Sequence, residues 1–164
     1  MKKLLLLIFL PFCAIAGEMD IPKEPIEITA DTLEIHQMEN VAIFNGDVKV
    51  RQSKFTLNSD TMRVYYKPAE NGEFDDENSN VQGQISRIEA EGNVILTADK
   101  DKITGEKAVY KADTQIANIS GNVVLTKGAN TIRGSYLEYN LATNESKITA
   151  PKNQRVHGFF VPEK

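Results

Sequence analysis

Two short phrases recur along most of the chain, and this repetition constrains the fold more than any other feature. The first phrase, a glycine followed by Asp or Asn and a short strand-like run, occurs at 46–50, 92–96 and 121–125. The second phrase, an apolar residue followed by a small-polar-apolar run, begins at Ile28, Leu57, Ile103 and Ile132. Units of fixed period stack on their neighbours to bury a shared core, so we expect a long surface or interior rather than one compact catalytic centre.

The spacing of the second phrase indicates a single insertion. Its first two copies begin 29 residues apart, as do the last two, whereas the middle interval is 46 residues. The 17 extra residues, at about 67–83, contain Pro68, Asn71-Gly72 and an acidic run at 75–80. The acids suggest calcium, but their spacing matches no loop with alternating ligands and a central glycine. We therefore interpret this segment as a solvated polar loop and predict no metal site.

Apolar residues alternate with polar ones inside each copy, as in Leu33 and Ile35 or Met62 and Val64. A period of two places the two sets on opposite faces of a strand. The Gly-Asp and Gly-Asn dipeptides fall where tight turns, bulges or sheet corners need positive φ. The sequence predicts an all-β fold of about fifteen short antiparallel strands with little helix, and residues 59–67 are predicted to be a strand. Alternation alone does not distinguish a filled sandwich from a hollow one.

The first residues are typical of a signal peptide. Lys2 and Lys3 precede an apolar stretch at 4–12, and Ala14-Ile15-Ala16 fits the small-x-small cleavage rule. We expect a cleaved signal peptide at 1–16 and one β-domain at 17–164, located in the periplasm. Cleavage changes the formal net charge from −4 to −6 and removes Cys13, the only cysteine. An uncleaved anchor is the alternative, and lipidation is disfavoured because bulky Phe12 precedes Cys13.

The sequence offers no recognisable catalytic constellation and no cofactor motif. His36 and His157 are interpreted as surface residues, and no basic stripe indicates a nucleic-acid partner. Two hypotheses compete with a lipid-binding interior. One is a scaffold with a filled core that binds only protein strand edges. The other is a periplasmic hydrolase in which acids such as Asp31, Asp60, Glu106 and Glu138 converge in a polar cleft. Three of these acids recur at one position of the repeat, which favours a role in turns or on one face.

Several segments together resemble the organic-solvent-tolerance (OstA-like) family, over about 25–162. They are Pro25 to Asp31, the three glycine phrases, 103–106, 132–134 and Val161-Pro162. The resemblance implies an open, twisted β-jellyroll with a V-shaped cross-section, whose apolar interior binds the lipid A part of lipopolysaccharide. It also implies copies joined end to end between an LptC-like inner-membrane protein and the N-terminal domain of an LptD-like outer-membrane protein. LptC-type relatives keep an N-terminal membrane helix and LptD-type relatives continue into a large barrel. We expect neither here, and an LptC-type anchored relative stays the alternative.

Alternate positions along each predicted strand give the candidate interior residues, a criterion that we call strand parity. They are Ile26, Ile28, Leu33, Ile35, Val48, Val50, Leu57, Met62, Val64, Val94, Leu96, Ile103, Tyr110, Val123, Leu125, Ile132, Leu137 and Tyr139. Ile26 and Ile28 match the family's N-terminal strand, which the resemblance places along the groove, and Tyr110 is an aromatic that can stack along acyl chains. For assembly, we expect the edge at Val156, Phe159, Phe160 and Val161 to join the edge at 26–35 of the next copy.

Overall fold

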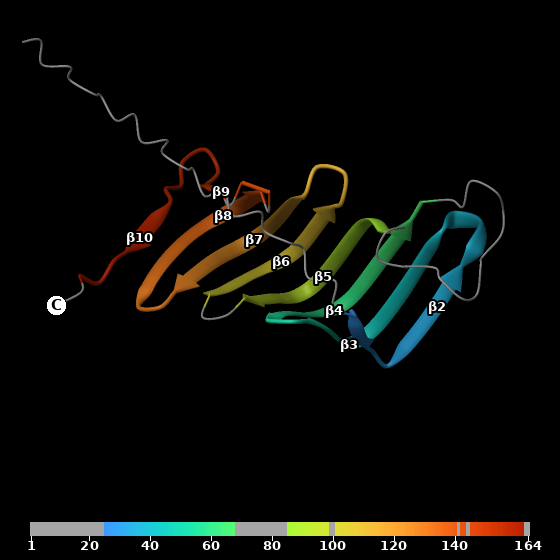
Figure 1. The fold of residues 1–164 in the computed structure, drawn as a ribbon. Helices are drawn as coiled ribbons and strands as arrows, with labels where there is room; N and C mark the ends of the chain where they lie inside the picture. The colour runs from blue at the N-terminus through green and yellow to red at the C-terminus, as the bar shows by residue number, and fades with distance from the viewer. Residues whose placement is uncertain (1–24, 68–84, 99–100, 141, 144, 163–164) are drawn as a thin grey trace, which may run out of the picture.

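The computed structural model describes residues 25–67, 85–98, 101–140, 142–143 and 145–162. The predicted signal peptide and the predicted polar loop, apart from Lys67, lie outside these ranges. All strands of the described residues belong to one antiparallel sheet (Figure 1), which confirms the predicted all-β fold class. Within these ranges, no helix combines the length and the apolar sequence that crossing a bilayer requires.

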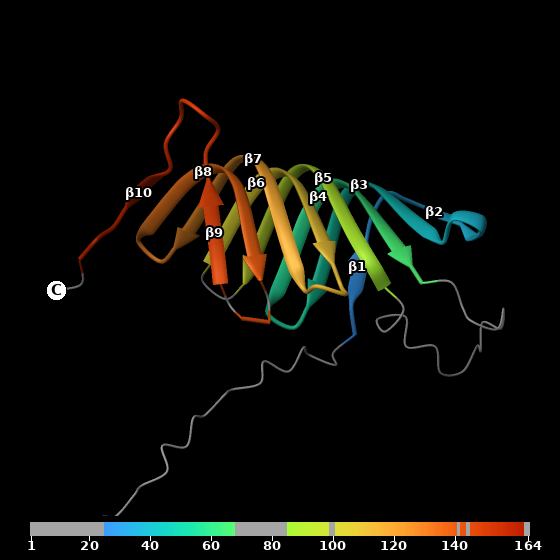
Figure 2. The same ribbon diagram turned by 90° about the horizontal axis from the view of Figure 1, so that it is seen from above.

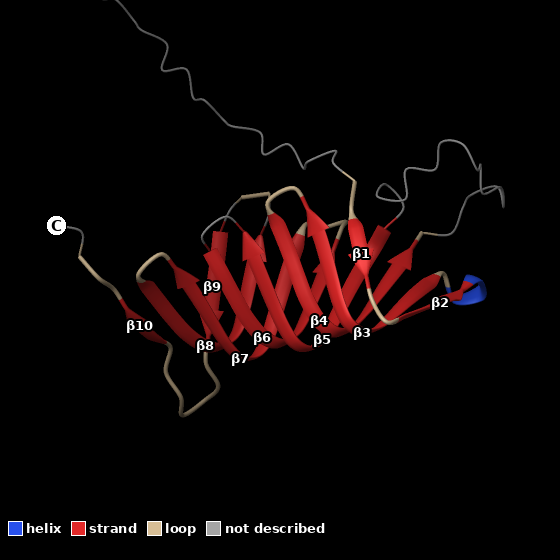
Figure 3. Cartoon of the chain, turned by 90° about the horizontal axis from the view of Figure 1, so that it is seen from below, coloured by secondary structure: helices blue, strands red, loops and turns tan. Residues whose placement is uncertain are grey.

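The strands follow one another across the sheet in chain order. Their bounds are β1 Glu27–Thr29, β2 Thr32–His36, β3 Val41–Gln52, β4 Phe55–Tyr66, β5 Ile85–Ala98, β6 Asp101–Lys111, β7 Ile116–Lys127, β8 Asn130–Asn140, β9 Glu145–Thr149 and β10 His157–Phe159. A single 3-10 turn, η1 (Gln37–Glu39), joins β2 to β3 (Figure 3). Both β1 and β2 pair with β3, and both β9 and β10 pair with β8. Each end of the open sheet is therefore made of two short strands.

The glycine phrases bend long strands instead of ending short ones. Gly46, Gly92 and Gly121 have φ of 81°, 79° and 82°, and the Asp or Asn after each also has positive φ. The register shifts at each of these places inside β3, β5 and β7, so they are β-bulges, which increase strand bending. Figure 2 shows the long strands bending over, so that the sheet forms two layers. The expected count of about fifteen short strands is therefore wrong: the described residues form ten.

Two repeated acids bind the bulge of the following strand. The side-chain amide of Asn93 donates to both carboxylate oxygens of Asp60, at 3.1 and 2.9 Å, and that of Asn122 donates to Glu106 at 2.7 Å. A Cβ placed on Gly92 would overlap Asp60, so the carboxylate packs directly over the bulge. The predicted role in turns is thus wrong for these two acids: they lie within strands, and their hydrogen bonds run to the neighbouring strand and not to their own backbone. In each of these contacts, one repeated phrase supplies the acid and the other supplies the bulge asparagine.

Six of the ten buried apolar side chains in the described residues form two clusters. One contains Val48, Met62 and Val64, and the other contains Ile119, Val123 and Leu137. Val48 lies on the opposite side of its bulge from Ala42, the residue that pairs with Val64. The Val48 cluster therefore contains side chains from both sides of the bend. This is expected if the two layers of the sheet pack against each other at this cluster.

Candidate functional site

Three rows of side chains cross the inner face of the sheet. In the Met62 row, paired positions run from β2 to β9 through Leu33, Phe44, Met62, Ala90, Ala108, Ile119, Leu137 and Ile148. The Val64 row runs through Ile35, Ala42, Val64, Ile88, Tyr110, Ala117 and Tyr139. The Leu57 row runs from β1 to β10 through Ile28, Val50, Leu57, Leu96, Ile103, Leu125, Ile132 and Gly158. Directly paired residues share a face, so each row is a continuous, largely apolar stripe.

Fourteen of the eighteen predicted interior residues lie in these rows, and Ile26, Val48, Val94 and Val123 lie outside them. Six are fully buried: Val48, Met62, Val64, Val94, Val123 and Leu137. Ten are half-buried: Ile26, Ile28, Val50, Leu57, Leu96, Ile103, Tyr110, Leu125, Ile132 and Tyr139. Burial raises the pKa of the Tyr110 hydroxyl further above physiological pH, where the side chain is neutral. Half-buried apolar side chains in a continuous stripe are a surface that a flexible apolar ligand can contact.

Leu33 and Ile35 correct the prediction that they lie inside. They belong to the inner rows, but they are 53% and 66% exposed, because β2 pairs on one side only and nothing in the described residues covers it. At the other end, Val156, Phe159, Phe160 and Val161 are exposed as well, with Phe160 at 65%. The predicted terminal strand is present as β10, although it spans only His157–Phe159. The apolar rows therefore reach solvent at both ends of the sheet.

Parity reasoning missed the inner residues that precede each bulge. Phe44, Ala90 and Ile119 each stand two positions before the glycine of their phrase and occupy the Met62 row. The signal was present in the sequence, since all three copies carry an apolar residue at that place. The inner positions keep the same parity on both sides of each bulge, as Phe44 and Val48 or Ile119 and Val123 do, so counting alternate residues back through the glycine would have found them.

The opposite face of the sheet carries paired charges. The Lys107 ammonium lies 2.7 Å from Glu91, and Arg63 lies 3.6 Å from the same carboxylate. The hydrogen bond from Lys107, and then its charge, hold the pKa of Glu91 below its ordinary value. These groups are partly exposed, so they favour solubility and add little to stability.

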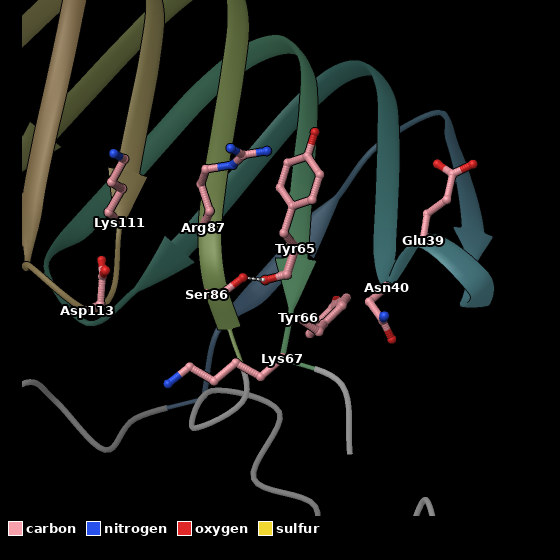
Figure 4. A pocket seen from close by; sticks show the side chains of 9 residues that line it. All are labelled: Glu39, Asn40, Tyr65, Tyr66, Lys67, Ser86, Arg87, Lys111 and Asp113. Carbon is pink, nitrogen blue, oxygen red and sulfur yellow. Dashed lines mark hydrogen bonds between the residues drawn. The ribbon is translucent and has the colours of Figure 1, made fainter. Parts of the chain in front are cut away.

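A second concave feature, the rim pocket, lies where β4 ends and β5 begins. It has a volume of about 430 Å³ and is lined by Glu39, Asn40, Tyr65, Tyr66, Lys67, Ser86, Arg87, Lys111 and Asp113 (Figure 4). Tyr65, Arg87 and Lys111 are directly paired positions on three neighbouring strands. No sequence prediction identified this pocket.

Two of the acids considered as catalytic candidates are held apart in the described part of the chain. No three potential metal-ligating side chains of His, Cys, Asp or Glu gather there. His36 and His157 are exposed, as predicted. Asp60 and Glu106 are each bound to a bulge asparagine of a different strand, so they do not converge.

Comparison with known proteins gives consistent matches. A family model described as LptA/(LptD N-terminal domain) LPS transport protein matches residues 27–145. An uncharacterised protein of Rhizobium meliloti (strain 1021) is 36% identical over 128 residues, which are 77% of this chain and 66% of that protein, just under two thirds of its length. The crystal structure of LptH from Pseudomonas aeruginosa, described as the LptA homologous periplasmic component of the conserved lipopolysaccharide transport device, matches with a TM-score of 0.66 and 18% identity, over 85% of this chain and 97% of that one. This structural likeness shows the same jellyroll fold.

Proposed function

Because the chain belongs to the LptA/(LptD N-terminal domain) LPS transport protein family, we propose that it is a non-enzymatic periplasmic carrier of lipopolysaccharide of the LptA type. Its apolar interior holds the acyl chains of lipid A, and copies joined end to end link an LptC-like protein at the inner membrane to an LptD-like protein at the outer membrane. The observation that carries the proposal is the Met62 row, which crosses eight strands and reaches solvent at Leu33.

Burial of acyl chains is the dominant favourable contribution in this proposal. Each buried CH₂ contributes ~0.8 kcal/mol, so several chains supply tens of kcal/mol before the cost of association is subtracted. An exposed ion pair contributes only ~0–1 kcal/mol. The chain has a formal net charge of −4 and faces an anionic glycolipid. Long-range attraction therefore does not drive binding, and a modest net affinity suits a carrier that must release its cargo.

End-to-end assembly extends the inner rows from one copy to the next. Gly158 of β10 and Ile28 of β1 are the two ends of the Leu57 row, and Ile148 of β9 and Leu33 of β2 are the two ends of the Met62 row. Strand addition that joins β10 to β1 and β9 to β2 therefore keeps each row aligned with itself. This contact is heterologous, so it builds filaments rather than closed dimers. It also covers Leu33 and Ile35.

Photo-crosslinking in cells that make labelled lipopolysaccharide tests the proposal. A photoreactive residue replaces Ile28, which is half-buried at the edge of the Leu57 row. The control replaces Glu34, which is exposed and points to the opposite face from Leu33 and Ile35. We expect a lipid adduct from position 28 and none from position 34.

Each outcome of this experiment has a clear meaning. An adduct at position 28 alone supports both the interior and its occupant. Equal adducts at both positions indicate contact with lipid surfaces in general and count against a binding interior. No adduct from a folded, exported protein favours the scaffold that binds only protein strand edges.

A further inference from the structure

Main-chain contacts between neighbouring strands hold the walls of the rim pocket. The Tyr66 amide donates to the Asn40 carbonyl at 2.9 Å, and the Ala112 amide donates to the Ser86 carbonyl at 3.0 Å. The Ser86 hydroxyl donates to the Tyr65 carbonyl at 3.1 Å. The two main-chain bonds continue the strand ladders one residue before the start of β3 and one residue past the end of β6, so the main chain around the pocket is held by its neighbours.

Three cationic side chains line this pocket. The Arg87 guanidinium stacks 4.1 Å from the centre of the Tyr65 ring, and its Nε lies 3.2 Å from Glu89, close enough for an ion pair although without the geometry of a hydrogen bond. Arg87 is therefore held in place from two sides. The ammonium groups of Lys67 and Lys111 have no hydrogen-bond or ion-pair partner in the described ranges. Ammonium groups without a partner, and a guanidinium, are donors from which a phosphate group accepts hydrogen bonds.

Two acidic side chains, Glu39 and Asp113, line the same pocket. The Asp113 carboxylate accepts a hydrogen bond from the Thr114 main-chain amide at 2.8 Å, which stabilises the turn that contains both residues. Arg87 is paired with Glu89, so three acids stand against three cations here. Lys67 and Lys111 are the cations without an ion-pair partner in the described ranges. An unpaired ammonium group is where an anionic group can approach an otherwise acidic protein.

Tyr66 connects this pocket to the apolar interior. Its side chain packs against the buried cluster of Val48, Met62 and Val64, and it also lines the pocket. Burial raises the pKa of its hydroxyl, so the residue presents a neutral, amphipathic surface at the junction. Arg87 and Lys111 alternate with the inner residues Ile88 and Tyr110, so they lie on the outer face of the sheet. Tyr66 joins this face to the interior at the sheet margin. This arrangement fits an amphiphile whose anionic head leaves the interior around that margin.

We propose that the rim pocket binds a phosphate group on the acylated sugar whose chains occupy the interior, with Lys67, Lys111 and Arg87 as its donors. This inference rests on the proposed function and adds the head-group site to it. Lipopolysaccharide then has a defined orientation, with its acyl chains beside the Val48 cluster and its phosphorylated sugar at the end of β4 and β5.

Equilibrium binding of defined lipids by the purified full chain tests this site. The probes are phosphorylated lipid A, the same lipid without its phosphates, and an unacylated glucosamine phosphate. The test variant is Lys67→Gln with Lys111→Gln, both at exposed positions. The control is Lys102→Gln with Lys152→Gln, which removes the same charge from exposed positions outside the pocket. Arg87 is left unchanged because it also packs on Tyr65.

We expect wild type and control to bind phosphorylated lipid A about tenfold more tightly than the dephosphorylated lipid. The test variant should lose most of this preference and bind the dephosphorylated lipid as wild type does. A full preference in the test variant, or an equal loss in the control, overturns the site and leaves the carrier function standing. Equally tight binding of the unacylated phosphosugar through the same lysines overturns the link to the lipid. Failure of wild type to bind either lipid overturns both proposals.

Discussion

Positions 105 and 134 require glycine because a side chain of the next strand packs directly over each of them. A Cβ on Gly105 would lie 2.5 Å from Cγ2 of Ile119 and 3.1 Å from the Ser120 carbonyl oxygen, and one on Gly134 would meet Ile148 in the same way. Each isoleucine stands 14 residues after its glycine. In the copy that carries the 17-residue insertion, the equivalent pair is Ser59 and Ala90. The three later copies therefore place either a glycine under a large side chain or a larger residue under alanine, whereas the first copy has Ala30 and Phe44 at the equivalent positions.

Replacing Gly105 with alanine tests this size matching. Gly105 is not among the glycines with positive φ, so strain at the backbone does not contribute and the cost comes from the collision. Ile119 is buried, and its β-branched side chain has little freedom to move aside. Overpacking of this kind costs ~1–3 kcal/mol. We expect Gly105→Ala to lower the free energy of unfolding by about 2 kcal/mol.

A double-mutant cycle with Ile119→Ala measures the coupling. Alone, Ile119→Ala should cost about 3 kcal/mol through lost burial and the cavity that it leaves. Together the changes reproduce the Ser59 and Ala90 pairing in size, so the double variant should be about 1–2 kcal/mol more stable than additivity predicts. Urea unfolding followed by circular dichroism gives all four values. The control is Gly128→Ala, whose Cβ would meet nothing within 4 Å and which should not couple to Ile119. Additive costs at Gly105 and Ile119 would refute the reasoning.

Two further predictions concern pH and assembly. Because Lys107 lowers the pKa of Glu91, the pair stabilises the folded protein above the ordinary carboxyl pKa, and this contribution disappears as pH falls through the lower folded value. Unfolding free energies measured between about pH 5 and about pH 3 should therefore fall less in Lys107→Gln than in wild type, and equal slopes would contradict this. Phe160→Asp, or a proline at Val156, should shorten oligomers and leave each protomer folded, whereas Met38→Asp, at a 99% exposed position outside the inner rows, should not. Light scattering across protein concentrations checks this, and unchanged concentration-dependent size would count against the assembly.

The sequence predicted the parts of the fold that lie within one copy of the repeat. Alternation inside a phrase placed Met62, Val64 and Leu137 on the inner face, where the structure buries them. The number of strands was wrong because positive φ at a glycine is equally compatible with a turn and a bulge. Only the pairing partners on the neighbouring strand distinguish these two structures.

Other features depend on contacts that periodicity does not encode. Alternation gives the face of Leu33 and Ile35, but their exposure depends on whether another layer covers β2. The rim pocket combines Asn40 with strand ends on either side of the insertion, so its residues follow no common spacing in the sequence. The lipid contacts of the inner residues stay predictions.

The chain-order arrangement of the strands has a consequence for the length of the molecule. Each 29-residue unit contributes two adjacent strands, and neighbouring strands lie about 4.8 Å apart. Adding or deleting one unit would therefore change the span of one copy by about 10 Å and leave the end strands intact. The distance that a single copy covers can thus change in fixed increments without a new fold.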